Sequence, residues 1–316
     1  MVVVYSDHKA MTFELLSKAR ELADAQKKQV TAVIIGKDEA SKDYIAYGAD
    51  QVYVVDKAPE HVKAEEYTQI LENIVKETKA ETVLIGSDKY GKELAPRLAS
   101  IFETGCVTDC TNVTWEKDHL NVERVVYSGN AIAVQQFTKT PYILTIPSKV
   151  FDPLKKDEKR SGEVIQKTYD VKPAASKIIS VKELQTEGVN VEDADIIVSC
   201  GRGLKNKDDI KIISDLAHVL KGKTVGCSRP IAADLKWLPE ERWIGLSGHK
   251  VKPKLYIATG ISGQIQHIAG MRDSGVIVAI NKDPDALIFK SADYGIVGDL
   301  YEVIPKLTTA IKDKMG

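Results

Sequence analysis

The chain has 316 residues, of which 43% are hydrophobic and 28% charged, the composition of a globular protein with room for two hydrophobic cores. Its 44 basic and 45 acidic side chains give a net charge of -1, so no broad positive field is present to attract a nucleic acid or an anionic membrane. Apolar runs such as Ile277–Ile280 are far shorter than the roughly 20 residues of a membrane-spanning helix, which argues against membrane insertion.

The N-terminus and the cysteines further limit the class of protein that the sequence can represent. Met1–Tyr5 enters a β-branched run directly, without the basic segment and cleavage site of a secretory signal, so we expect a cytoplasmic protein. Four cysteines are too few and too scattered for a disulfide framework. Cys106 and Cys110 have no second ligand pair nearby, and we expect free thiols rather than a zinc or iron–sulfur site.

The first hundred residues alternate short β-branched runs with amphipathic segments. This βαβα order predicts a mostly parallel sheet with helices on both faces. The expected strands are Val2–Tyr5, Val30–Ile35, Val52–Val55 and Val83–Ile85, and the expected helices are Met11–Lys27, Ser41–Tyr47, Pro59–Lys76 and Lys92–Ile101.

Strand-like stretches with turn signals follow, and they predict a largely antiparallel extension of the first domain. The expected strands of this extension are Val107–Trp115, Leu120–Tyr127, Ala131–Phe137 and Tyr142–Ile146. The mixed charges of Lys155–Arg160 indicate an exposed loop, Ser176–Glu183 is expected to be the last strand, and Thr186–Asp193 is expected to be a linker. The prediction is therefore an α/β protein with two domains, residues 1–190 and 191–316.

The second domain contains apolar strands that end in loops rich in glycine and polar residues. In an open parallel sheet the carboxyl ends of the strands lie along one edge, so we expect these loops to converge. Glycines and helix N-termini suit a phosphate, and arginines add charge, which predicts a diphosphate-containing ligand. The strands are Ile196–Val198, Thr224–Gly226, Leu255–Ala258, Val276–Ile280 and Tyr294–Val297.

Single residues in these loops allow more than one interpretation. Arg202 and Arg229 are equally compatible with an exposed surface, and Asn281 with a helix cap. Asp299 precedes the final helix, where capping is the slightly favoured role. A lone histidine such as His267 near a helix start is usually an ordinary polar residue.

Longer motifs in the second half resemble the electron transfer flavoprotein alpha subunit family, which includes the FixB-type proteins. The resemblance covers residues 195–305 and is looser in the first half, at segments 83–86 and 91–99, at Asp109 and at residues 129–130. The motifs are Gly201–Gly203, Cys227–Pro230, Trp243–Gly248, Leu255–His267, Ile280–Ala286 and Ala292–Leu300.

The resemblance implies a doubly wound C-terminal domain that binds FAD, and an N-terminal nucleotide-binding-like domain that docks on a beta subunit. It also implies a positive charge from Arg229 and His267 near the flavin ring, which would favour the reduced, anionic form. Leu246 and Ser247 depart from the Gln and Thr of many members, although the hydroxyl is kept. The implied FAD contacts are Arg202, Ser228, Arg229, Ile244, Gly245, Leu246, Ser247, Ser262, Gly263, Gln264, Ile265, Gln266, His267, Asn281, Asp299 and Leu300.

In functional terms the resemblance implies an electron carrier, with no catalytic triad and no metal ligands. Its electrons would come from flavin dehydrogenases such as acyl-CoA dehydrogenases and pass to a quinone reductase or another acceptor. One alternative is a subunit of an electron-bifurcating complex that uses NADH and ferredoxin or flavodoxin. An alternative of another class is an NAD-dependent enzyme, because related folds bring the same kind of loops to a diphosphate.

Overall fold

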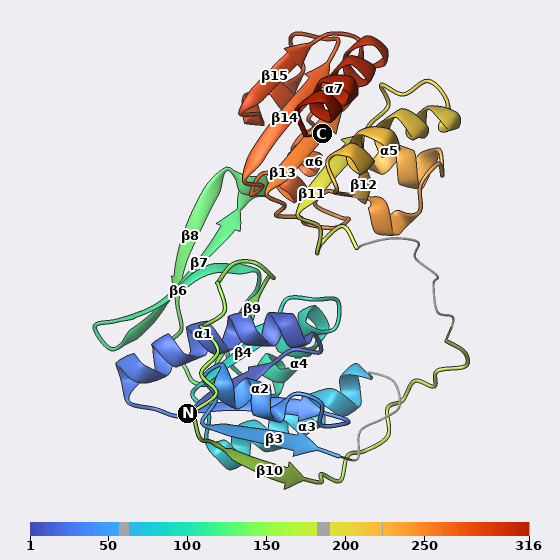
Figure 1. The fold of residues 1–316 in the computed structure, drawn as a ribbon. Coiled ribbons are helices and arrows are strands. Elements are labelled where there is room, and N and C mark those ends of the chain that lie inside the picture. Colours follow the sequence, from blue (N-terminus) through green and yellow to red (C-terminus); the bar gives the residue numbers. More distant parts are fainter. Residues whose placement is uncertain (57–62, 182–189, 223, 316) are drawn as a thin grey trace. The chain divides into compact units, whose positions relative to one another are not determined.

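The chain forms two compact units, residues 1–180 and 181–316, in a computed structural model that describes residues 1–56, 63–181, 190–222 and 224–315. Each unit is built around its own parallel sheet (Figure 1). Among the described residues, no helix has both the length and the apolar character to span a membrane.

A seven-stranded parallel sheet forms the centre of the first unit, in the order β10-β3-β2-β1-β4-β9-β5. Its strands are β1 (Val2–Tyr5), β2 (Val30–Ile35), β3 (Gln51–Val55), β4 (Thr82–Gly86), β5 (Cys106–Val107), β9 (Tyr142–Ile146) and β10 (Glu163–Lys167). Its helices are α1 (Lys9–Gln26), α2 (Ser41–Ala46), α3 (Ala64–Thr78) and α4 (Gly91–Ile101). Residues 59–62 of the helix expected at Pro59–Lys76 lie outside the described part of the chain.

Both faces of this sheet are buried. Val2 and Val4 of β1 pack into a core with Leu15 of α1, whereas Val3 and Tyr5 pack into a second core with residues of α3 and α4. Successive side chains of a strand point to opposite faces, so a strand covered on both sides needs a continuous apolar run. This confirms the predicted α/β arrangement of the first hundred residues.

The antiparallel extension is smaller than predicted. It consists of β6 (Cys110–Glu116), β7 (His119–Val126) and β8 (Ala131–Gln136), which pair in chain order. The strand at residues 142–146 was wrongly assigned to it, because β9 lies parallel to β4 in the main sheet. The three-stranded sheet is instead inserted in the connection from β5 to β9, which lie side by side.

The end of the first unit also differs from the prediction. The last strand is β10, which pairs in parallel with β3, whereas residues 176–181 form no strand. The sequence of β10 has polar residues at Glu163, Gln166 and Lys167, which an edge strand tolerates. Because of these polar residues, the hydrophobic periodicity of the sequence does not predict a strand there. Residues 182–183 of the predicted strand and 186–189 of the predicted linker lie outside the described residues, and residues 155–160 form the predicted, largely exposed loop.

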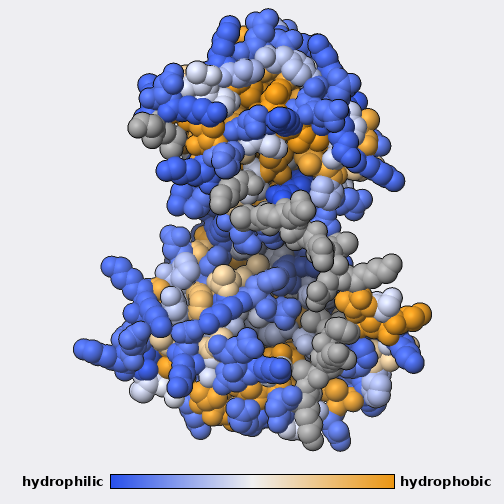
Figure 2. All heavy atoms as spheres, turned by 45° about the vertical axis from the view of Figure 1, so that its right-hand side comes forward, coloured by the Kyte–Doolittle hydropathy of each residue, from blue (hydrophilic) through white to orange (hydrophobic). Residues whose placement is uncertain are grey.

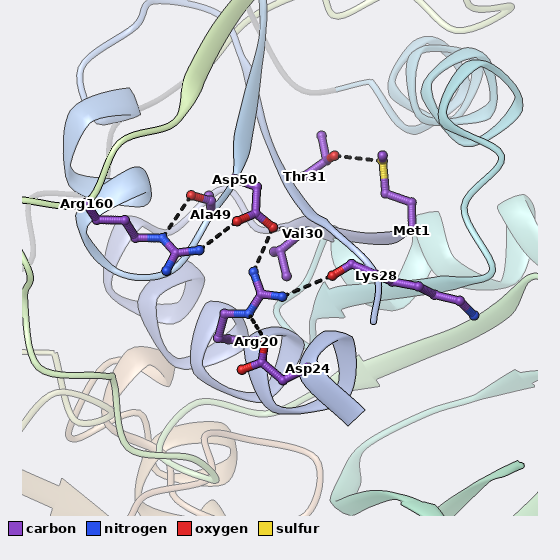
Figure 3. Close-up of polar contacts among 9 residues, drawn as sticks. All are labelled: Met1, Arg20, Asp24, Lys28, Val30, Thr31, Ala49, Asp50 and Arg160. Atoms are coloured by element: carbon purple, nitrogen blue, oxygen red, sulfur yellow. Dashed lines mark hydrogen bonds and ion pairs between the residues drawn. The ribbon is translucent and has the colours of Figure 1, made fainter. Parts of the chain in front are cut away.

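Asp50 ties that loop to the rest of the unit (Figure 3). Its carboxylate accepts hydrogen bonds from Arg20 of α1 at 2.7 Å, from Arg160 at 2.7 Å and from the backbone N–H of Val30 at 2.9 Å. Charge-assisted hydrogen bonds of this kind are the stronger ones in proteins. One side chain therefore joins α1, β2 and the loop that leads to β10.

The second unit contains a five-stranded parallel sheet in the order β12-β11-β13-β14-β15. Its strands are β11 (Ile196–Cys200), β12 (Thr224–Cys227), β13 (Leu255–Thr259), β14 (Val276–Asn281) and β15 (Tyr294–Val297), and its helices are α5 (Ile210–Val219), α6 (Ile265–Met271) and α7 (Leu300–Met315). The chain adds β12 on one side of β11 and then β13, β14 and β15 on the other side, so the strand order switches between β11 and β13. Doubly wound sheets bind ligands at this kind of switch point. The predicted strands and the doubly wound fold are confirmed.

The surface in Figure 2 is mostly hydrophilic and is interrupted by hydrophobic areas on each unit. In the first unit the exposed side chains of β8 include Ile132, 63% exposed, and Val134, 65% exposed. These side chains lie on the three-stranded sheet and not on the parallel sheet, whose residues form the two cores.

Candidate functional site

A cavity of about 560 Å³ lies in the second unit, where the loops after the five parallel strands meet. Its volume falls within the range of roughly 300–1,000 Å³ that is usual for small-molecule and cofactor sites. Fourteen of the sixteen residues predicted as ligand contacts line it. They are Arg202, Ser228, Arg229, Ile244, Gly245, Leu246, Ser247, Ser262, Gln264, Gln266, His267, Asn281, Asp299 and Leu300.

The two other predicted residues do not line the cavity. Gly263 has a φ of +81° and lies against Ile288, whose backbone nitrogen would be 2.1 Å from an added Cβ. A glycine is therefore required at this position, because the loop packs too tightly there for a side chain. Ile265 is the first residue of α6, and its side chain is 50% exposed outside the cavity lining.

Sequence reasoning missed ten residues of the lining. Eight of them lie inside the recognised motifs, beside or between the predicted contacts, so taking each motif whole would have found them. Lys205 and Tyr301 lie just outside the motifs, two positions after Gly203 and one position after Leu300. The ten are Gly203, Lys205, Pro230, Trp243, Gly260, Ile261, Lys282, Asp283, Ala286 and Tyr301.

Glycines bring the loops after β11 and β13 into direct backbone contact. Gly203 donates its N–H to the carbonyl of Gly260 at 3.0 Å, and Gly201 donates to Thr259 at 3.0 Å. A Cβ on Gly203 would lie 2.6 Å from the Cα of Gly260, a distance that no side chain tolerates. The glycines therefore serve the contact between two loops, in addition to any approach to a ligand.

Arg229 provides positive charge at the cavity wall. Its guanidinium carbon lies 5.9 Å from the centre of the Trp243 ring, a cation–π arrangement that orients the planar side chain. Ser228, just before it, is buried and is held by a backbone hydrogen bond of 2.9 Å from its N–H to the carbonyl of Cys200. The loop after β12 thus presents an oriented arginine on a fixed backbone.

His267 is buried, 7% exposed, and its Nε2 lies 3.0 Å from the hydroxyl oxygen of Tyr256. Burial lowers the pKa of His267 to about 4, and the backbone carbonyl of Ile244 opposes this shift only in part. The ring is therefore neutral near pH 7 in this conformation. The expectation that His267 adds a positive charge beside Arg229 is wrong for this state, because the apolar surroundings disfavour the cation.

Asn281 and Asp299 hold the loops in which they lie. Asn281 donates from Nδ2 to the carbonyl of Ile261 at 2.9 Å and accepts from the N–H of Asp283 at 3.0 Å. Asp299 accepts from the N–H of Tyr301 at 2.9 Å, so it caps α7 as the sequence suggested. Both side chains also line the cavity.

Tyr301 connects the end of the sheet to the loop after β11. Its hydroxyl donates to Asp209 at 2.5 Å and accepts from the N–H of Lys205 at 2.7 Å, while the Lys205 ammonium lies 5.0 Å from the centre of its ring. Lys205 and Arg202 therefore bring two cationic side chains to the cavity wall that lies after β11.

The cavity has the properties that a flavin dinucleotide requires. It combines the cationic side chains of Arg202, Lys205, Arg229 and Lys282 with apolar walls. The ring of His267 also lines the cavity, and its buried Nδ1 has no well-aligned hydrogen-bond partner within the described part of the chain. No cluster of potential metal ligands was found among the described residues.

Comparison with known families identifies this arrangement. Residues 2–172 match the electron transfer flavoprotein domain, and residues 190–272 match the electron transfer flavoprotein FAD-binding domain. The cavity-bearing unit is thus the FAD-binding domain of a flavoprotein, and FAD is its cofactor. The chain belongs to the electron transfer flavoprotein alpha subunit family, whose members normally pair with a beta subunit.

Individual relatives align over nearly the whole chain. An electron transfer flavoprotein subunit alpha of Thermoanaerobacterium thermosaccharolyticum is 44% identical over 96% of this chain and 93% of its own length. Protein FixB of Escherichia coli is 35% identical over 98% of this chain and 97% of its own length. Subunit LctC of the lactate dehydrogenase (NAD(+),ferredoxin) of Acetobacterium woodii is 38% identical over 98% of this chain and 77% of its own length.

Proposed function

We propose that this chain is the FAD-holding alpha subunit of a heterodimeric electron transfer flavoprotein. It accepts electrons from flavin dehydrogenases, such as acyl-CoA dehydrogenases, and passes them to a quinone reductase or another acceptor. The convergence of five strand-end loops on one cavity with an oriented arginine is the observation that carries this proposal.

The wall residues have separate tasks in this proposal. Arg202, Lys205 and Lys282 bind the diphosphate by charge, because they are the cations of the loops after β11 and β14. Ser262 and the start of α6 offer backbone N–H groups to the same anion. Asp299 and Leu300 bind the adenosine end, and the segment 244–247 borders the flavin ring.

Bound FAD supplies reversible electron acceptance at its ring. Arg229 places positive charge beside that ring and so stabilises the anionic reduced form. His267 orients the ring by hydrogen bonding, and Ser228 and Ser247 add hydroxyl groups at the cavity wall. No residue has to act as a general acid, base or nucleophile in electron transfer.

Co-expression with an electron transfer flavoprotein beta subunit from the same organism tests the proposal. We expect a yellow heterodimer whose extract contains FAD, which is reduced by a flavin dehydrogenase with its substrate and reoxidised by a quinone reductase. A colourless heterodimer whose extract contains NAD and no flavin would instead support the NAD-dependent enzyme, and would overturn the carrier.

A bifurcating complex is the second candidate, because LctC, a relative at 38% identity, is a subunit of an enzyme named for NAD(+) and ferredoxin. The cofactor content of the same preparation separates the two functions. One FAD with AMP in the partner subunit supports the plain carrier. Two FAD per heterodimer, together with NADH-dependent reduction of ferredoxin or flavodoxin, support bifurcation.

A further inference from the structure

His249 lies where a loop of the FAD cavity closes on itself. Its N–H donates to the carbonyl of Trp243 at 2.8 Å, and its own carbonyl accepts from the N–H of Gly245 at 3.1 Å. A parallel bridge pairs it with Ile244. Residues 244–247 line the cavity, whereas His249 does not. A change at His249 therefore reaches the FAD site through the backbone of this loop.

The side chain of His249 joins the loop to the start of the second unit. Its Nδ1 lies 2.9 Å from Oε1 of Glu192. Glu192 lies in the turn before β11, and its neighbours Val191 and Ala194 are buried in the core of this unit. The carboxylate is therefore attached to a turn that the core holds in place, and it can fix the histidine.

The tip of the loop needs support of this kind. Leu246 and Ser247 are both exposed, although they line the cavity. One support is the hydrogen bond of 2.7 Å from the N–H of Leu246 to the carbonyl of Gln266. The paired ends of the loop, at Ile244 and His249, are the other. The position of the tip thus depends on how firmly His249 is held.

We propose that His249 is a positioning residue, which in its protonated form pairs with Glu192 and thereby holds residues 244–247 in the arrangement that binds FAD. The inference rests on the proposed FAD site. An imidazolium donates a charge-assisted hydrogen bond to a carboxylate, and such bonds are stronger than those of neutral groups. The loop is therefore held more firmly when His249 is charged than when it is neutral.

Two carboxylates favour the charged form of His249. The hydrogen bond with Glu192 raises the pKa of His249 above its ordinary value of 6.5, burial opposes this increase, and the negative charges of Glu192 and Glu241 add to it. Glu241 lies in the turn that precedes the loop. The neighbouring side chains of Lys250 and Lys252 are exposed. The effect on the loop should be fully present below pH 6.5 and lost as the pH rises through the raised pKa.

Flavin fluorescence titration of the deflavinated heterodimer between pH 5.5 and 8.5 tests the proposal. We expect the affinity of the parent for FAD to fall about two- to fivefold across this range, the size expected of a partly exposed ion pair. His249→Gln and Glu192→Gln should both remove this pH dependence and bind like the parent at pH 8.5. The double variant should be no weaker than either single variant, because both remove the same contact.

His218→Gln is the matched control, because it removes an exposed imidazole of α5 that does not line the cavity. It should keep the pH dependence of the parent. His249→Lys should keep the low-pH affinity up to pH 8.5, since its ammonium group stays charged. The NMR signal of the His249 ring, which is absent in His249→Gln, should titrate at the pH at which the affinity changes.

The outcome is separable from that of the proposed function. If the heterodimer binds no FAD at any pH, the proposed function fails. If FAD binds but its affinity in the parent does not change with pH, only the role of His249 is refuted, even where the variants do not fold. A pH dependence that persists in a folded His249→Gln would refute that role as well.

Discussion

Arg229 and His267 contribute different polar groups to the cavity wall. Arg229 is exposed toward the cavity and oriented by the Trp243 ring, so it keeps its charge. His267 is buried beside Tyr256 and loses its charge. The site therefore has one fixed cation and one neutral hydrogen-bonding ring in these two positions, because solvent reaches only the arginine.

Replacing Arg229 by alanine should weaken FAD retention by about 10- to 150-fold and lower the midpoint potential of FAD, because a charge-assisted contact worth about 1.5–3 kcal/mol is lost. FAD content after gel filtration and a potentiometric titration measure the two effects. Arg229→Lys keeps the charge but not the planar group over Trp243, so it should restore the potential more than the retention. A spectrum and potential identical to the parent in Arg229→Ala would refute the ring contact.

The low pKa of His267 predicts a pH dependence of stability. The folded ring stays neutral down to about pH 4, whereas in the unfolded chain it takes up a proton below its ordinary pKa of 6.5. The unfolded chain thus binds more protons in this window, and the free energy of unfolding falls as the pH decreases from 6.5 to 4. The loss from this one residue is about 3 kcal/mol.

Urea unfolding of the FAD-free subunit between pH 4.5 and 7.5 measures this dependence, and His267→Gln should flatten it. His249 provides a contrast in the same unit, because its hydrogen bond with Glu192 raises its pKa. The stabilisation that this hydrogen bond gives the folded state is fully present below pH 6.5. It is lost as the pH rises through the raised pKa of His249 in the folded protein, a pH range above that of His267. An equally steep acid slope in His267→Gln would contradict the assignment.

At the scale of elements, the loops after β11 and β13 form one wall because glycines let their backbones touch. Gly203 and Gly260 share a hydrogen bond of 3.0 Å and have no space for a side chain between them. Gly260 also has a φ of +61°, which favours glycine for a second reason. The shape of the cavity at the strand-order switch depends on this contact.

Gly203→Ala should therefore push the two loops apart and weaken FAD binding by about 5- to 150-fold, since overpacking typically costs about 1–3 kcal/mol. Flavin fluorescence titration of the deflavinated protein measures the affinity. Gly105→Ala is the matched control, because its added Cβ would first meet Phe137 at 3.5 Å, an ordinary contact. Parent-like FAD affinity in a folded Gly203→Ala would show that the loop contact does not shape the site.

At the scale of the whole molecule, the FAD cavity belongs to one unit. Its lining residues all lie between Arg202 and Tyr301, and the two cores of this unit contain residues from Val191 to Ile311. The first unit has two cores of its own on the faces of its sheet. Each unit thus has the hydrophobic core that independent folding requires.

We accordingly propose that the domains divide near residue 190 and that each folds alone. A fragment of residues 190–316 should fold and bind FAD, although more weakly than the heterodimer, and residues 1–180 should fold without binding it. Circular dichroism and flavin content after reconstitution measure both properties. A folded fragment 190–316 that binds no flavin would show that residues outside this unit complete the site.

The sequence alone determined the elements with a strong local signal. Apolar runs such as Val2–Tyr5 predicted strands buried on both faces, and the motifs after Asp195 predicted which loops meet, because parallel strands end at a common edge. Strand β10 escaped prediction, since an edge strand needs little apolar surface. The placement of β9 beside β4 also escaped, because pairing partners are not encoded in local periodicity.

Only the tertiary structure decided how individual site residues behave. Nothing in the sequence Leu255–Thr259 marks Tyr256 as the partner of His267, and nothing near His267 indicates its low pKa. Both properties arise from burial and from contacts between segments distant in the chain. Local composition therefore determined the fold class and the loops of the site, whereas the charge and hydrogen bonding of the site residues depend on three-dimensional packing.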